Sequence, residues 1–152
     1  MDIVQPYIDN LNNLSDNLEE IGVEVVKDNV DFILFLLKET QLAENIKSDG
    51  SWIGFYKKST EQYASDPWNK PRKDKVAGQG FNLEWSGDFL DKMVVQSKKN
   101  SFSIFSRDSK QILLEKEYGV LTKLTEKNND LFNNQVMLPN LYKYVLNNLF
   151  KI

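Results

Sequence analysis

The stretch formed by residues 16–37, DNLEEIGVEVVKDNVDFILFLL, decides most of the expected fold. Its first half repeats apolar residues at intervals of three and four, the spacing of one helix face, and Leu14, Leu18, Ile21 and Val25 form this stripe. Ser15 or Asp16 is a suitable N-cap, and Glu19 lies three residues beyond Asp16, as in a capping box. The pattern predicts a long amphipathic helix that ends at about Asn45.

The second half of this helix, residues 30–37, is apolar on nearly every side apart from Asp31. A helix that is apolar all round must be covered on all sides. We therefore expect it to lie in the core or to pack against another subunit, and Phe35 is a candidate for such a contact. Residues 47–50 (KSDG) supply the turn chemistry that ends the helix.

The segments on either side of this helix predict a mixed fold. A short helix limited by Pro6 is expected over residues 2–13. Residues 93–95 (MVV) and 101–104 (SFSI) flank a turn-like segment and indicate a β-hairpin. Ser106 or Asp108 can cap a short helix that Gly119 ends, and Pro139 suits the first position of a final amphipathic helix.

We thus predict an α+β fold in which a long N-terminal amphipathic helix packs on a small antiparallel sheet, with a short C-terminal helix. A chain of 152 residues fits one domain, residues 1–152. Residues 64–82 are polar and contain Pro67, Pro71, Gly78 and Gly80, so they are expected to form a long exposed loop.

This loop and the aromatic segment before it contain candidate contact residues. Trp68 lies among positive charges, and the candidates for partner or subunit contact are Trp52, Trp68, Lys70, Arg72 and Lys73, together with Phe35. A tryptophan among lysines suits docking on a protein neighbour, and it also suits stacking on a base beside a phosphate backbone. We favour the protein neighbour and expect no specific nucleic-acid binding.

Composition argues against catalysis. The chain has no cysteine and no histidine, so thiolate chemistry and the commonest general base are excluded. Asp88 and Asp91 lie three residues apart, as in a carboxylate pair, but they have no further ligands and are expected to be surface residues. We expect no enzyme activity, no metal and no cofactor. The sequence also suggests neither a signal peptide nor a membrane span.

Charge is divided unevenly along the chain. Residues 1–50 hold eleven Asp or Glu against three Lys, whereas residues 51–152 hold eleven against sixteen Lys or Arg. Such a division suits head-to-tail contact between copies, in which the acidic half of one subunit meets the basic half of the next. Two solvated surfaces would have the same composition.

Several short motifs occur in a recognisable order. They are GSWIG at residues 50–54, Tyr56, TEQY at 60–63, LEWSGDF at 83–89, IFSRDSK at 104–110, and Tyr118 with Gly119. Together they resemble the small virion-morphogenesis, tail-completion and head–tail connector (neck) proteins of tailed bacteriophages, including hypothetical proteins of crAss-like phages that infect Bacteroidetes. The resemblance covers about residues 15–150, and Ser86 stands where the family pattern has threonine before Gly-Asp/Glu.

We read the central motif as structural. Ser86 and Asp88 can bond nearby backbone groups, Gly87 permits a tight bend, and Phe89 is expected in the core where a strand begins. Tyr118 and Gly119 belong to the same set of motif residues.

The resemblance implies a structural virion protein, a ring subunit that joins portal or capsid to tail. Its expected partners are further copies of itself and the portal, adaptor, capsid or tail proteins, and it would surround the DNA channel. It would be made in the host cytoplasm and be located in the virion. The alternative from another class is a small acidic inhibitor or immunity protein that binds a basic toxin through its acidic half.

Overall fold

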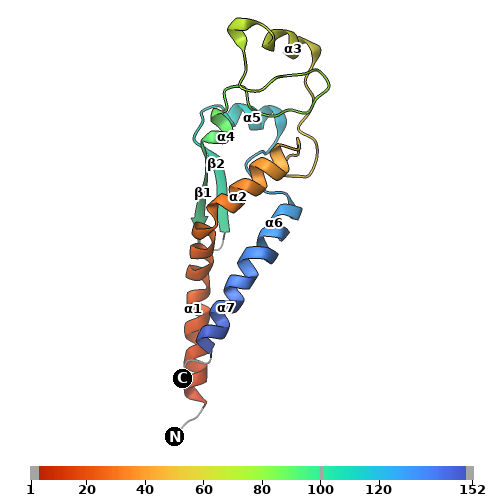
Figure 1. Cartoon of the computed structure of the whole chain (residues 1–152). Coiled ribbons are helices and arrows are strands. Elements are labelled where there is room, and N and C mark those ends of the chain that lie inside the picture. The colour runs from red at the N-terminus through yellow and green to blue at the C-terminus, as the bar shows by residue number, and fades with distance from the viewer. Residues whose placement is uncertain (1–3, 100, 150–152) are drawn as a thin grey trace.

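The computed structural model describes residues 4–99 and 101–149. The chain is elongated, with a head at one end and a stalk of two helices at the other (Figure 1). Helices and one two-stranded antiparallel sheet make up the described part, which confirms the mixed helix-and-sheet class.

The stalk consists of α1 (Gln5–Asp28) and α7 (Leu138–Leu149), which lie side by side and run in opposite directions (Figure 1). The start of α1 and the end of α7 therefore lie at the same end of the molecule. Pro6 occupies the first turn of α1, where its missing N–H has no helical partner to lose. The helix then continues through Ser15 and Asp16, so the start predicted at those residues is wrong.

The single long N-terminal helix is not confirmed, because it is divided at Asn29. Asn29 has φ −119° and ψ 25°, and its side-chain amide donates to the Val25 carbonyl at 2.8 Å, a local bond that competes with the helix ladder. Beyond it, α2 (Val30–Leu37) leaves the axis of α1 and enters the head, followed by a π-helical turn, η1 (Lys38–Leu42) (Figure 1).

The β-hairpin is confirmed. Strand β1 (Met93–Lys98) pairs with β2 (Ser101–Ser106) in a register that places Met93 opposite Ser106 and Val95 opposite Ile104. Both α1 and α2 contact β1. Ile104 is buried and Phe102 half-buried, and both belong to the core or pack against it, since residues two apart on a strand share one face.

The C-terminal helix is longer than predicted. The helix α6 (Glu126–Phe132), the π-helical turn η3 (Asn133–Met137) and α7 follow each other without a break, as one rod that descends from the head into the stalk (Figure 1). The rod begins after Thr125 and not at Pro139, and Thr125 caps its start, since its hydroxyl accepts from the Asn128 N–H at 3.3 Å. Pro139 is the second residue of α7, which follows the π turn.

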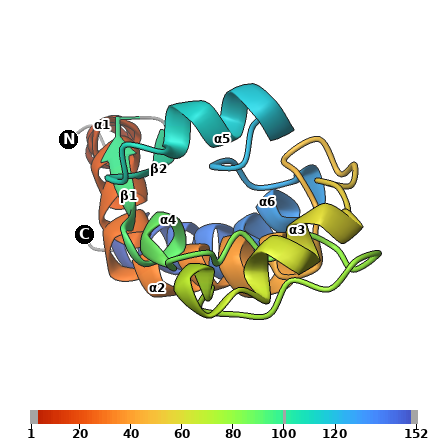
Figure 2. The same ribbon diagram turned by 90° about the horizontal axis from the view of Figure 1, so that it is seen from above.

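Short elements and long connections form the head. They are α3 (Lys58–Ala64), the 3₁₀ turn η2 (Pro67–Asn69), α4 (Asp88–Asp91) and α5 (Gln111–Tyr118). Seen from above, α5 lies on one side of the head, and α3 and α4 lie on the other (Figure 2). As predicted, α5 ends at Gly119, whose φ of +89° suits glycine.

The core lies where α2, the hairpin, α6 and the loop before α6 meet. Ile33, Leu36 and Leu37 of α2 are buried, which confirms core burial for this segment, whereas Phe35 points outward and is exposed. Leu121 and Phe132 complete this centre, and the ring of Phe132 meets that of Phe102 edge-on at 5.6 Å.

Candidate assembly interface

The stalk exposes large apolar side chains on both of its helices. They are Tyr7, Ile8 and Leu11 on α1, and Leu138, Tyr142 and Leu146 on α7. The three residues of α7 are four apart, so they form one stripe along the helix. Tyr142 is 66% exposed, and an aligned set of this kind is typical of a surface that another chain covers.

The exposed residues of α1 continue a stripe that is buried nearer the head. Leu11, Leu18 and Val25 are spaced by seven, and so are Tyr7, Leu14 and Ile21, which is the a and d pattern of a coiled coil. Leu14 and Val25 are buried within the chain, whereas Leu11 is 54% exposed. One helix face is thus covered near the head and exposed toward the end of the stalk.

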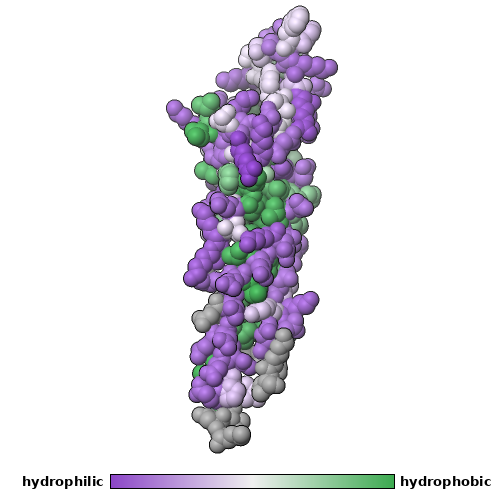
Figure 3. Space-filling view, turned by 90° about the vertical axis from the view of Figure 1, so that its left-hand side faces the viewer, coloured by the Kyte–Doolittle hydropathy of each residue, from purple (hydrophilic) through white to green (hydrophobic). Residues whose placement is uncertain are grey.

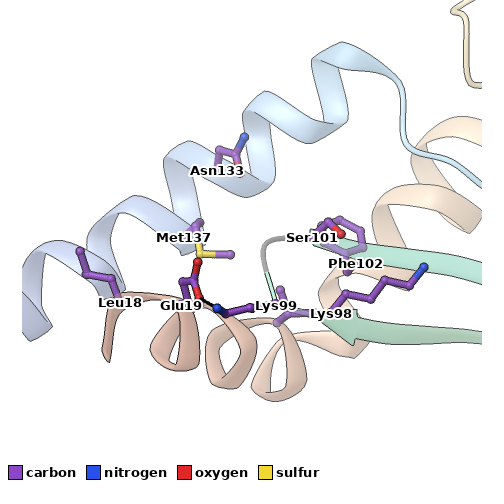
Figure 4. A pocket seen from close by; sticks show the side chains of 10 residues that line it. Leu18, Glu19, Lys98, Lys99, Ser101, Phe102, Asn133 and Met137 are labelled. Carbon is purple, nitrogen blue, oxygen red and sulfur yellow. Dashed lines mark ion pairs between the residues drawn. The ribbon is translucent and has the colours of Figure 1, made fainter. Parts of the chain in front are cut away.

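A pocket of about 380 Å³ lies where α1, the hairpin turn and η3 meet. Leu18 and Glu19 come from α1, Lys98 and Lys99 from the hairpin, and Asn133 and Met137 from the rod (Figure 4). The Lys99 ammonium pairs with the Glu19 carboxylate at 2.7 Å, and this ion pair raises the pKa of Lys99. Gly22 also lines the pocket and leaves room in it.

A second, shallow hollow lies on the other side of Leu18, against α7. It is almost entirely apolar, and its lining includes Leu18, Leu138, Leu141, Tyr142 and Val145. One face of the molecule shows hydrophobic atoms in a broken line from the middle down the stalk, flanked by hydrophilic ones (Figure 3). The stalk thus offers apolar recesses beside its exposed apolar side chains.

The two stalk helices differ in charge. Exposed acidic residues on α1 are Asp9, Glu20, Glu24 and Asp28, with Lys27 as its one cation. Helix α7 has no acidic residue and carries Lys143. Contact between α1 helices of two copies would bring like charges together, whereas contact between α1 and the α7 of another copy would not.

The contact residues predicted from the sequence lie away from the stalk. Trp68, on η2, is 94% exposed, and Trp52 is exposed in the head with its ring 5.2 Å from that of Phe55. Phe35 is exposed on α2, where its ring stacks on that of Phe32 at 6.4 Å. The structure places these side chains at the surface without gathering them into one site.

Two of the predicted basic contact residues are paired within the chain. Arg72 lies 2.6 Å from the Asp91 carboxylate and 3.8 Å from that of Glu84, and Lys73 also pairs with Glu84. Lys70 is exposed. The loop over residues 64–82 is less exposed than predicted, because Pro71 and Lys75 are buried within it.

The geometry of Ser86, Gly87 and Phe89 fits the structural reading of the central motif, although the element that follows differs. Gly87 has φ +87° and lies directly before α4, the Asp88 N–H donates to the Ser86 hydroxyl at 3.4 Å, and Phe89 is buried. A helical turn, not a strand, begins there. Tyr118 ends α5, and its ring lies 5.1 Å from that of Phe81.

Asp88 and Asp91 face cations of the same chain. Asp88 pairs with Lys92 at 3.1 Å, and the Ser86 hydroxyl and Lys92 hold the pKa of Asp88 below its ordinary value. In the part of the chain that the structure describes, no group of three or more metal-ligating side chains is found. Within the same residues, no helix has the length and apolar character needed to cross a bilayer.

Comparison with known proteins finds no family model, no curated protein and no solved structure that matches the chain. What the chain does must therefore be argued from its own surfaces. The stalk surface was missed because the helix over residues 2–13 was separated from the one after it. Followed without a break across residues 13–15, the seven-residue spacing from Tyr7 to Ile21 is the signal that could have found it.

Proposed function

We propose that this chain is a non-catalytic structural protein that assembles by packing the stalk of one copy against the stalk of another. The exposed apolar stripe shared by α1 and α7 is the observation that supports this. Two helices can bury only the seam between them, whereas a third or fourth helix can cover what remains.

The contact that we propose joins α1 of one copy to α7 of the next. The acidic flank of α1 would then face a helix that has no acidic residue and carries Lys143. Leu11 and Tyr142, one from each helix, would be at the centre of the contact. Made twice about a two-fold axis, this contact gives a four-helix bundle, and repeated around a higher axis it closes a ring.

The setting that we propose is the neck of a tailed phage virion, where a connector or tail-completion ring joins portal or capsid to tail. This placement is supported by the order of the short motifs from residue 50 to residue 119. An elongated subunit with a separate head and stalk suits such a ring, since the stalk can contact further copies while the head meets a neighbouring virion layer.

Light scattering over a concentration series tests the assembly. The unmodified chain is expected to form a dimer or a closed ring. Leu11→Glu and Tyr142→Glu each place a carboxylate in the contact, so each should shift the chain to monomer. Ile112→Glu is the matched control, because Ile112 is 78% exposed on α5 in the head, and it should leave the mass unchanged.

Three results would overturn the proposal in different ways. A monomer at every concentration would remove self-assembly. If the oligomers persist in both stalk variants but dissociate in Trp68→Ser, the contact between copies lies in the head. A strict one-to-one complex of the monomer with a basic protein would instead favour the inhibitor.

A further inference from the structure

The head contains a pocket of about 620 Å³, which lies between α5 and two segments within residues 55–60 and 75–89. Aromatic rings line much of it, and they belong to Phe55, Tyr56, Phe81, Trp85, Phe89 and Tyr118. The rings of Tyr56 and Phe81 meet at 4.7 Å and those of Phe81 and Tyr118 at 5.1 Å, so they form a continuous wall. Small-molecule sites commonly enclose about 300–1,000 Å³ behind such walls.

One wall of the pocket contains a buried lysine. Lys75 is only 4% exposed, and its ammonium lies 5.3 Å from the centre of the Tyr56 ring and 6.0 Å from that of Trp85. The ammonium donates to the Asn82 side-chain oxygen, which also accepts from the Tyr56 hydroxyl at 2.9 Å and the Glu84 N–H at 3.1 Å.

The charge of Lys75 is poorly compensated where it lies. Among the salt bridges of the described residues, none involves Lys75. A neutral amide oxygen and two ring faces replace only part of the water that an ammonium loses on burial. Burial accordingly lowers the pKa of Lys75, although Glu84 opposes this from a longer distance.

The rest of the lining is also positive on balance. Lys57 and Lys110 line the pocket together with Lys75, and Glu117 is the one acidic residue in the lining. An anion that entered would thus meet three ammonium groups and one carboxylate. A planar apolar body would meet the aromatic wall.

We propose that this pocket binds a small organic anion, an aromatic ring that carries a carboxylate, with the ring against Tyr56, Phe81 and Tyr118 and the carboxylate on Lys75. The carboxylate supplies the anionic partner that the buried ammonium lacks, as a charge-assisted hydrogen bond. The flat body stacks against the aromatic wall. The site lies in the head, so it is independent of stalk assembly.

The test uses the full-length chain and two probes that differ at one group, 2-naphthoate and 2-naphthamide. Binding is followed through the indole N–H signal of Trp85 in ¹H–¹⁵N spectra, which the Trp85→Phe variant assigns among the three tryptophans. 2-Naphthoate should bind about tenfold more tightly than 2-naphthamide, because only the acid offers an anion to Lys75.

Substitution then locates the preference. Lys75→Met keeps a side chain of similar length and removes its charge. It should therefore abolish the preference for 2-naphthoate and leave the affinity for 2-naphthamide nearly unchanged. Lys58→Met is the control, since Lys58 is exposed on the neighbouring α3 and does not line the pocket. If Lys75→Met fails to fold, the comparison of the two probes on the unmodified chain still decides.

Two results would overturn the inference. Equal affinity for acid and amide would show an apolar pocket in which Lys75 plays no part, and absence of any shift at Trp85 would show that the pocket admits neither probe. The Leu11→Glu and Tyr142→Glu variants should keep the preference for 2-naphthoate even when they are monomeric. Failure of stalk assembly and failure of binding in the head can therefore be told apart.

Discussion

At the scale of single residues, replacing two glycines by alanine should change stability in opposite directions. Gly22 lies inside α1, and a methyl group added there would meet no atom within 4 Å. Glycine in a helix costs backbone entropy that alanine does not. We predict that Gly22→Ala raises the free energy of unfolding by about 0.5–1 kcal/mol, measured by urea denaturation of the monomeric Tyr142→Glu background.

Gly87→Ala is the matched substitution that should destabilise the fold. Gly87 has φ +87°, and a methyl group there would collide with the Arg72 side chain, which holds the ion pair to Asp91. This substitution should lower the free energy of unfolding by about 1 kcal/mol or more. The same sign of change for both glycines would contradict this account of α1 and α4.

Glu115 gives the chain a pH-dependent contribution to stability. Burial alone would raise its pKa, but hydrogen bonds from Thr122, Gln111 and the Leu121 N–H outweigh burial and hold the pKa below its ordinary value of 4.5. The unfolded chain therefore binds this proton more readily than the folded chain. The contribution is complete above the unfolded pKa and is lost as the pH falls through the folded pKa.

We predict that Glu115→Gln lowers stability at neutral pH and flattens its decline between about pH 5 and about pH 3. An amide cannot accept all the bonds that the carboxylate accepts from Thr122 and Leu121. Thermal unfolding at a series of pH values measures this. Glu44→Gln, at an exposed position, should retain the parent profile, and an unchanged profile for Glu115→Gln would refute the assignment.

At the scale of elements, a buried polar contact joins the π turn η1 to the start of α6. The Gln41 side chain donates to the Lys123 carbonyl and accepts from the Thr125 N–H, both at 2.9 Å. The Asn128 amide donates to the Leu36 carbonyl at 3.0 Å and the Thr40 hydroxyl at 3.1 Å. These bonds fix the rod on the end of α2.

Gln41→Met tests this contact. It keeps the volume of a side chain that is 1% exposed and leaves the partly buried Thr125 N–H and Lys123 carbonyl without their partner. We predict a loss of about 1–3 kcal/mol in the free energy of unfolding, measured by urea denaturation. Glu39→Gln, exposed on the same turn, should change stability little, and an equal loss in both would assign the effect to the turn itself.

The π turn η3 explains why the rod continues at Pro139, where the sequence suggests the start of a separate helix. Pro139 cannot donate a helical hydrogen bond, and its ring crowds the carbonyl four residues earlier. The wider turn of η3 contains that carbonyl and ends at Met137, two residues before Pro139, which lets the rod pass through Pro139 without a break.

At the scale of the whole molecule, the division of charge crosses the division into head and stalk. The acidic first fifty residues form α1 in the stalk and α2 and η1 in the head, whereas the positively charged remainder forms the rest of the head, the hairpin and the rod. If stalks associate, the folded state gains stability by mass action. We predict that the melting temperature rises with protein concentration for the unmodified chain, as measured by scanning calorimetry.

Tyr142→Glu should remove this concentration dependence, and Ile112→Glu should keep it. A melting temperature that is independent of concentration in the unmodified chain would agree with a monomer and contradict stalk assembly. The measurement does not depend on the pocket of the head.

The sequence by itself determined the mixed class, the hairpin, the apolar character that places residues 30–37 in the core or against another subunit, and the end of α5 at Gly119. Each follows from a local cause, namely side-chain periodicity, turn chemistry or the freedom of glycine. Only the tertiary structure decided the break at Asn29, the rod that continues through Pro139, the burial of Lys75 and the exposure of Tyr142. These depend on which distant segments cover a residue, and that free energy comes from contacts that no local pattern contains.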